Sequence, residues 1–235
     1  MREAPVTTRF KLCSFKTCPW VHRAAIVLRE KGIDYEIEYI DRHNRPDWFQ
    51  AISPHSKVPV LIVDGEHALF ESNAIAEYLD EVAEPRLHPE DPILRARNRA
   101  WTDYVPTFSQ VTHISNAVDE DDFNARVEKA QIPASRLEGA LEKRGNDGPF
   151  FNGEKFSLVD AAYAPALLRF TFLDRVRPTG LLDDKPLLTA WRDALIAYPA
   201  VLNGVVPEFH DVWQDQVRTN GKWVVQFLPS AAAAE

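Results

Sequence analysis

The sequence lacks the features that mark membrane-spanning, secreted and duplex-binding proteins. Its two cysteines among 235 residues are too few for a disulfide framework. No run approaches the roughly 18 apolar residues of a membrane-spanning helix, and the first residues lack the apolar core of a secretory signal. The net charge of −8, with no long basic run, argues against a duplex nucleic-acid partner. We therefore expect a cytoplasmic protein with no membrane or nucleic-acid partner.

Metal-ligand spacing is missing as well. Seven histidines are present, but no pair has HxxxH or similar spacing, so we predict no metal site. What is present is ordinary for a globular protein: 45% apolar and 26% charged residues. A chain of this length can bury a core without disulfides, in one large domain or two small ones.

The first part of the chain alternates strand-like and helix-like stretches. Apolar residues at i, i+3, i+4 and i+7 mark helix faces, and short β-branched runs mark strands. The order is β-α-β-α-β-β-α, which predicts a thioredoxin-like domain over residues 1–83. The expected strands are 10–14, 35–40, 58–63 and 68–70, and the expected helices are 21–28, 46–52 and 75–82.

The second part carries only helical periodicity. Residues 84–92 hold three prolines and several charges, so we expect a linker there. Ser157 and Asp160 have the spacing of a capping box. We predict an all-helical domain over residues 93–235, with helices at about 93–115, 122–144, 157–174 and 186–197.

Cys18 lies between the first strand and the first helix. Pro19 suits the first helical position, so Cys18 falls at the N-cap, where unpaired N–H groups and the helix dipole favour a thiolate. A thiolate is the nucleophilic form of cysteine, and we expect a lowered pKa here. The alternative is a small buried side chain, which is also our interpretation of Cys13. Because Val21 stands where a resolving cysteine would be, an external thiol must release any mixed disulfide on Cys18.

Four motifs occur together in this order: Cys18-Pro19-Trp20-Val21-His22-Arg23, Asn44-Arg45-Pro46-Asp47-Trp48-Phe49, Val58-Pro59-Val60-Leu61 and Glu71-Ser72-Asn73-Ala74-Ile75. Together they resemble the cysteine-type glutathione transferases, namely the omega class and the plant dehydroascorbate reductases. The resemblance is strong over residues 10–83 and loose over the helical part. It implies the glutathione transferase architecture, an α/β thioredoxin-like N-terminal domain followed by an all-α C-terminal domain. It also implies glutathione as co-substrate and a homodimer.

The resemblance assigns glutathione-binding roles. Val58 precedes a cis Pro59 and pairs with the cysteinyl part of glutathione, although an ordinary trans edge-strand proline is the alternative. Glu71 and Ser72 hold the γ-glutamyl end, and a cap of the following helix by Ser72 or Asn73 is compatible with that role. The remaining expected glutathione contacts are Trp20, Arg45 and Lys57, of which the two cations could equally be solvated surface charges.

Several side chains of the helical part are candidates for a second-substrate pocket. Tyr104 and Phe108 share a helix face with Trp101, and core packing explains them equally well. The resemblance directs Arg169 toward the pocket, and Trp213 could close it from the C-terminal side. We expect these residues to favour a small apolar or aromatic second substrate.

These observations predict a glutathione-dependent thiol transferase or reductase. It would remove glutathione from disulfides or from thioethers, the latter as in bacterial omega-like glutathione lyases, through a mixed disulfide on Cys18. Dehydroascorbate reduction by the same cysteine and a non-catalytic glutathione-binding module are the alternatives. A chloride-channel-like relative is disfavoured, because charged residues in the first helix would prevent membrane entry.

Overall fold

The computed structural model describes residues 8–229. Its first part is a four-stranded sheet in the order β2-β1-β3-β4, in which β1 and β2 are parallel and the other neighbours are antiparallel. The strands are β1 (Phe10–Ser14), β2 (Tyr35–Tyr39), β3 (Val60–Val63) and β4 (His67–Phe70). The helices of this part are α1 (Pro19–Glu30), α2 (Asp47–Ile52) and α3 (Ser72–Val82).

Local sequence signals explain where these elements begin and end. Residues 64–66 connect β3 to β4, and the Glu66 N–H donates to the Val63 carbonyl oxygen at 3.1 Å. The two central residues of this turn, Asp64 and Gly65, have positive φ values of 54° and 78°. Gly32 has a φ of 61° and ends α1 in the left-handed conformation that glycine adopts freely. The predicted β-α-β-α-β-β-α order is therefore observed, with β3 beginning at Val60, two residues after the expected start.

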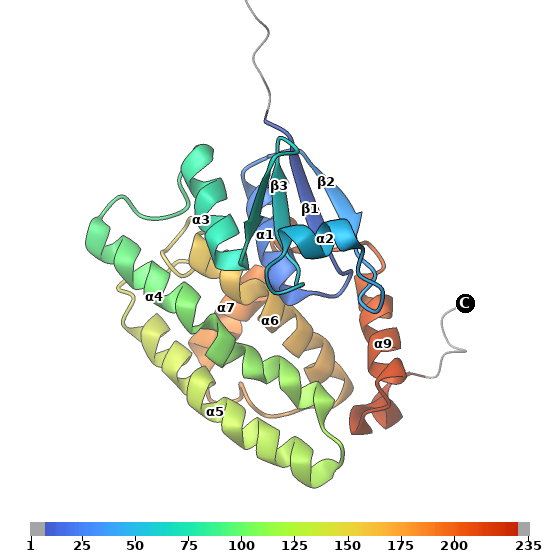
Figure 1. Ribbon diagram of the computed structural model, residues 1–235. Coiled ribbons are helices and arrows are strands. Elements are labelled where there is room, and N and C mark those ends of the chain that lie inside the picture. The colour runs from blue at the N-terminus through green and yellow to red at the C-terminus, as the bar shows by residue number, and fades with distance from the viewer. Residues whose placement is uncertain (1–7, 230–235) are drawn as a thin grey trace, which may run out of the picture.

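The second part consists of helices within the described residues. The main ones are α4 (Pro92–Phe108), α5 (Glu120–Glu142), α6 (Leu158–Val176), α7 (Pro186–Ala197) and α9 (Phe209–Thr219). Shorter segments are the 3-10 helix η1 (Ser109–Asn116), α8 (Pro199–Leu202) and the 3-10 helix η2 (Trp223–Phe227). In Figure 1, α4 and α5 run diagonally side by side, and α9 lies on the opposite side of α6.

The expected single helix over residues 93–115 is instead α4 followed by η1. The hydroxyl groups of Ser109, Thr112 and Ser115 each donate to the carbonyl oxygen three residues earlier, at 2.8, 2.7 and 2.8 Å. Such side-chain bonds compete with the i to i−4 ladder and favour the tighter winding. The sequence patterns did not predict α8, α9 or η2, and α4 begins at Pro92, one residue inside the expected linker.

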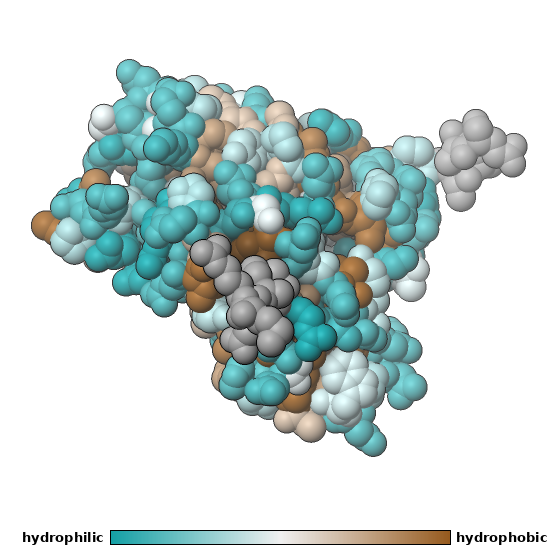
Figure 2. Space-filling model, turned by 90° about the horizontal axis from the view of Figure 1, so that it is seen from above, coloured by the Kyte–Doolittle hydropathy of each residue, from teal (hydrophilic) through white to brown (hydrophobic). Residues whose placement is uncertain are grey.

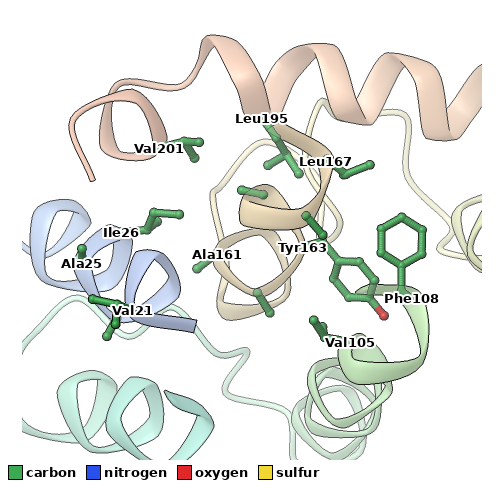
Figure 3. Packing of buried hydrophobic residues seen from close by; sticks show 14 of the residues in the cluster. Val21, Ala25, Ile26, Val105, Phe108, Ala161, Tyr163, Leu167, Leu195 and Val201 are labelled. Carbon is green, nitrogen blue, oxygen red and sulfur yellow. The ribbon is translucent and has the colours of Figure 1, made fainter. Parts of the chain in front are cut away.

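Helix α6 is the centre of the hydrophobic core. It packs against α1 from the first part and against α4 and α7 from the second. Figure 3 shows Val21 and Ile26 of α1 on one side of α6 and Phe108 of α4 on the other. Both parts therefore share a continuous core, while the surface seen in Figure 2 is mostly hydrophilic with smaller hydrophobic areas.

A buried carboxylate fixes the start of α6. Ser157 and Asp160 form the predicted capping box. Asp160 is fully buried and also accepts hydrogen bonds from the backbone N–H of Phe151, at 2.9 Å, and the indole N–H of Trp191, at 2.6 Å. This arrangement links the start of α6 to α7. Arg169 lies two residues beyond the middle of α6, beside the turn that carries Cys18.

Candidate active site

Cys18 occupies the N-cap of α1. Its backbone is extended (φ −71°, ψ 120°), Pro19 follows at the first helical position, and no side chain caps the helix. Its N–H donates to the Phe15 carbonyl at 3.1 Å, which closes the turn after β1. The Sγ atom lies 4.0 Å from the carbonyl oxygen of Val58. The structure thus places the half-buried thiol where the sequence predicted, at a helix start and beside the Val58-Pro59 step.

The expected low pKa of Cys18 is wrong for the free protein. Burial raises the pKa of the thiol above its ordinary value. The backbone N–H groups of Val21 and Trp20 and the charges of Arg169 and Arg42 act in the opposite direction without compensating for it. The helix start therefore stabilises a thiolate as argued, but the loss of solvent around the sulfur is the larger effect.

A cavity of about 320 Å³ opens beside this turn. It lies between the first part of the chain and α4, which contributes Thr102 and Pro106. The Val58-Pro59 bond is cis, as the resemblance implied. Six of the seven residues predicted to bind glutathione line this cavity: Trp20, Lys57, Val58, Pro59, Glu71 and Ser72.

The start of α3 faces the cavity without a side-chain cap. Glu71 is the N-cap residue and has a φ of 66°, in the left-handed region that non-glycine residues rarely adopt. Ser72 is the first helical residue and is buried, yet no side chain bonds the N–H groups of this helix start. Free N–H groups and the helix dipole make the position suitable for a carboxylate ligand, and the carboxylate of Glu71 is suitable for an ammonium group.

Three hydrogen-bonded residues that the sequence analysis did not assign to glutathione, Arg23, Asn73 and Asp103, also line the cavity. The Arg23 Nη1 donates to the side-chain oxygen of Asn73 at 3.3 Å, and the Asn73 amide donates to Asp103 at 3.0 Å. Burial lowers the pKa of Arg23 to about 10, and its Nε and Nη2 atoms have no hydrogen-bond partner within residues 8–229. Arg23 lies three residues after Trp20 and could have been noticed by helical spacing. Asp103 comes from α4, and nothing local places it here.

Arg45 does not line this cavity. Its guanidinium lies over the ring of Phe15, with 5.9 Å between its carbon and the ring centroid. The Lys57 side chain does line the cavity, so of the two expected cations only Lys57 is placed at the site in this structure.

Two smaller cavities flank the Cys18 turn. One, of about 230 Å³, is lined by Cys18 itself and by largely apolar residues including Phe15, Tyr39 and Val206. The other, of about 210 Å³, is lined by Thr17 and Pro19 on one side and by Arg169 and Trp213 on the other. Arg169 and Trp213 are therefore brought together as predicted for a second-substrate pocket.

Tyr104 and Phe108 do not line these three cavities, which corrects their assignment. Phe108 is 1% exposed and packs against Tyr163, with ring centroids 5.2 Å apart. Tyr104 lies against Trp101 and accepts a long hydrogen bond from Arg136 at 3.4 Å. Phe108 therefore packs on α6 as part of the core, whereas Tyr104 is half-buried against Trp101.

Arg169 connects the helical part to the Cys18 turn. Its guanidinium donates to the carbonyl oxygens of Pro165 and Thr17, at 2.7 and 3.0 Å. It also donates to Nδ1 of His22 at 3.2 Å, so Nδ1 is unprotonated and Nε2–H donates to the Val201 carbonyl at 2.8 Å. Burial lowers the pKa of Arg169 to about 10, and the group stays charged at neutral pH.

Within residues 8–229, no cluster of potential metal ligands is found. In the same span, no helix is both long enough and apolar enough to cross a membrane.

A thioredoxin-like domain with a thiol at the start of its first helix, joined to a helical domain across a ligand-sized cavity, defines a glutathione transferase-type protein. The comparisons agree. The family models described as "Glutathione S-transferase, N-terminal domain" and "Glutathione S-transferase, C-terminal domain" match residues 17–82 and 124–201. The chain belongs to the glutathione S-transferase family, and the expected fold and the expected co-substrate, glutathione, are confirmed at the level of that family.

Similarity alone does not assign a class within the family. Glutathione S-transferase omega-2 of Rattus norvegicus is 31% identical over 198 residues, covering 81% of this chain and 76% of the relative. Among solved structures, glutathione transferase Omega 3C of Trametes versicolor has a TM-score of 0.75 at 26% identity and covers 93% of this chain and 94% of its own. A Tau class enzyme from mango has the same TM-score at 27% identity, with coverage of 87% and 96%.

Proposed function

We propose that the protein is a cysteine-type, omega-like glutathione transferase that removes glutathione from mixed disulfides or from thioethers through a mixed disulfide on Cys18. The observation that carries the proposal is the position of the thiol. It lies at an uncapped helix start and lines one cavity, while Trp20 and Val58 near it line the cavity of the expected glutathione contacts and Thr17 and Pro19 line a third. A hydroxyl at this position would favour conjugation, whereas a thiol can itself take up the glutathionyl group.

The reaction balances with glutathione as the only reductant. The Cys18 thiolate attacks the glutathionyl sulfur, the bond to the leaving group breaks, and the leaving thiolate or carbanion keeps the electron pair and takes up a proton. A second glutathione thiolate then attacks the Cys18–glutathione disulfide, releases oxidised glutathione and restores the Cys18 thiolate. Two glutathione units thus provide the two electrons that the leaving group gains.

Named groups support each requirement of this cycle. Glu71, Ser72 and the free N–H groups of α3 suit the γ-glutamyl end, and Lys57 suits the glycyl carboxylate. The carbonyl oxygen of Val58 lies 4.0 Å from the Sγ atom of Cys18, and the cysteinyl part of glutathione would bind beside these two atoms. The N–H groups of Trp20 and Val21 and the Arg169 charge stabilise the thiolate that forms during attack.

Further parts of the proposal concern partners and compartment. Trp213 suits a small apolar or aromatic second substrate. A homodimer is supported by the exposed apolar side chains of Val82, Ile93 and Leu94 on α3 and α4, and light scattering on the purified protein would test it. Because Cys13 and Cys18 are both free thiols, we place the protein in the reducing cytoplasm.

The test is reduction of a small glutathione mixed disulfide, with Cys18→Ala as the variant. Wild type should turn the disulfide over, and Cys18→Ala should lose turnover by at least about a hundredfold while still binding glutathione. The Cys13→Ala variant is the matched control and should remain active, since Cys13 is fully buried in β1. Full activity of Cys18→Ala would contradict the mechanism.

Two rival functions are separated by extending the same assay. Dehydroascorbate turned over more efficiently than any disulfide or thioether would favour a dehydroascorbate reductase using the same cysteine. Glutathione binding without turnover of any of the three substrate classes would favour a binding module.

A further inference from the structure

Within the described part of the chain, the cavity shared by Arg169 and Trp213 is lined by cations and by no carboxylate. The chain as a whole has 35 acidic and 27 basic residues. Among the described residues that line this cavity there is no Asp or Glu, whereas Arg169, Lys222 and His113 are present. The cavity beside Tyr39 also lacks Asp and Glu among its described lining residues and is lined by Lys16 and Arg29, but Lys16 pairs with Glu208 at 3.7 Å. Arg169 and Lys222 are the two permanent cations of the cavity beside Trp213.

The two cations differ in how free they are to bind a ligand. Arg169 is 7% exposed and uses its N–H groups on the carbonyl oxygens of Thr17 and Pro165 and on His22, so it contributes a fixed positive charge. Lys222 is half-buried, and none of the ion pairs within residues 8–229 uses it. Its ammonium group is therefore available for an anion.

The rest of the wall suits a ligand with a polar end and a flat body. Asn116, Gln216 and Asn220 carry side-chain N–H donors, and Trp213 adds an apolar surface held in place by Phe172, with 5.6 Å between ring centroids. Thr17 and Pro19, the sequence neighbours of Cys18, line this cavity, whereas Cys18 itself lines the cavity beside Tyr39. The group that leaves the sulfur would have to extend past Thr17 and Pro19 to reach Lys222.

We infer that the preferred second substrate carries a carboxylate or a similar anionic group, bound by Lys222 in the field of Arg169, on a small apolar or aromatic body that contacts Trp213. This inference rests on the proposed function, because it names the chemistry of the group that leaves as Cys18 takes up glutathione. It refines the expectation of an apolar or aromatic second substrate by adding a negative charge at one end.

The test compares two disulfide substrates whose leaving groups differ only in that charge. The probes are the mixed disulfides of glutathione with para-mercaptobenzoate and with para-mercaptobenzamide. Each kcat/KM is divided by the rate at which the same disulfide reacts with glutathione alone, which removes differences between the leaving thiols. We expect wild type to prefer the carboxylate by about tenfold, and the preference to fall as salt is added.

Lys222→Gln should reduce this preference by about fivefold, and Lys222→Glu should reduce it further. The control is Lys143→Gln, which removes the same charge from an exposed lysine just after α5 and should leave the preference unchanged. Lys143 is far from Lys222. The ring of Phe123, near the start of α5, contacts the ring of Trp223, which follows Lys222 in sequence. Helix α5 rises about 30 Å between Phe123 and residue 143. The unfolding midpoint of each variant, compared with wild type, excludes misfolding as the cause.

Different results would overturn different statements. Equal use of both disulfides, or an unchanged preference in Lys222→Gln, would overturn the anionic substrate and leave the proposed function standing. A preference for the amide would also overturn the anionic substrate and would favour the cavity beside Tyr39 as the place of the leaving group. No turnover of either disulfide would overturn the proposed function, and this inference with it.

Discussion

Arg169 of α6 donates a hydrogen bond of 3.0 Å to the carbonyl oxygen of Thr17, the residue before Cys18. This bond joins the helical part of the chain to the turn that carries Cys18. The same guanidinium lowers the pKa of Cys18 by its charge, against the larger effect of burial. Arg169 is therefore a positioning residue for the turn and a partner of the thiolate.

Removing this charge should slow reactions of the Cys18 thiolate. In the free protein, the alkylation rate of Cys18 by iodoacetamide should rise about tenfold per pH unit above neutrality, because burial keeps the thiol protonated there. Arg169→Gln should shift this profile to higher pH, and Arg42→Gln should shift it less, since Arg42 is exposed and its charge has the smaller effect. Peptide mass spectrometry measures both rates. A plateau at neutral pH in wild type would contradict the raised pKa.

Glu71 should contribute to glutathione binding without affecting the intrinsic reactivity of the thiol. Glu71→Gln removes the carboxylate at the cavity and should weaken glutathione binding by about tenfold, as measured by calorimetry on the Cys18→Ala background. Glu66→Gln, in the exposed hairpin after β3, is the matched control and should bind normally. Equal losses in both variants would argue against a local contact.

His22 should make the protein less stable in acid. Burial and the Arg169 charge lower its pKa from 6.5 to about 3, outweighing its bond to Val201. Between pH 6.5 and about 3, the His22 side chain is protonated in the unfolded chain but neutral in the folded protein. The free energy of unfolding therefore falls as the pH drops through this range. Urea unfolding at several pH values should show a shallower decline for His22→Gln than for wild type. His43→Gln, an exposed histidine, should follow the wild-type curve.

Asp160 should contribute more to the free energy of unfolding than Ser157, its partner in the capping box. Asp160→Asn replaces an acceptor of several buried hydrogen bonds with a group that must also donate, which should cost about 2–4 kcal/mol. Ser157→Ala removes only the cap and should cost about 1 kcal/mol. Urea unfolding compares the two. A larger loss in Ser157→Ala would show that the cap, and not the link to Trp191, holds α6.

Phe108 should behave as a core residue. Phe108→Ala should lower the free energy of unfolding by about 3–5 kcal/mol, because it leaves a cavity against Tyr163. Phe108→Leu should cost less and should leave the choice among second substrates unchanged. A change in substrate preference without a loss of stability would restore Phe108 to the pocket.

Much of the first part could be predicted because its signals are local. Pro19 and Gly32 define the ends of α1, and Asp64-Gly65 defines a hairpin turn. In the second part, Ser157 with Asp160 defines a helix start in the same way. Each depends on backbone conformations that neighbouring residues determine. The resemblance then added what spacing could not, the grouping of Val58, Glu71 and Ser72, which the structure places around one cavity.

The sequence by itself determined the thioredoxin-like order, the helical second part and the position of Cys18 at a helix start. Tertiary structure alone decided how deeply the Cys18 sulfur is buried, and therefore the direction in which its pKa moves. It also decided that Phe108 belongs to the core, that Asp103 lines the same cavity as Glu71 and Ser72, and that Arg169 and Lys222 line another. These outcomes depend on helices that are distant in sequence and pack around the Cys18 turn. The burial of the sulfur and the charges near it come from residues in many parts of the fold, so local sequence patterns cannot predict them.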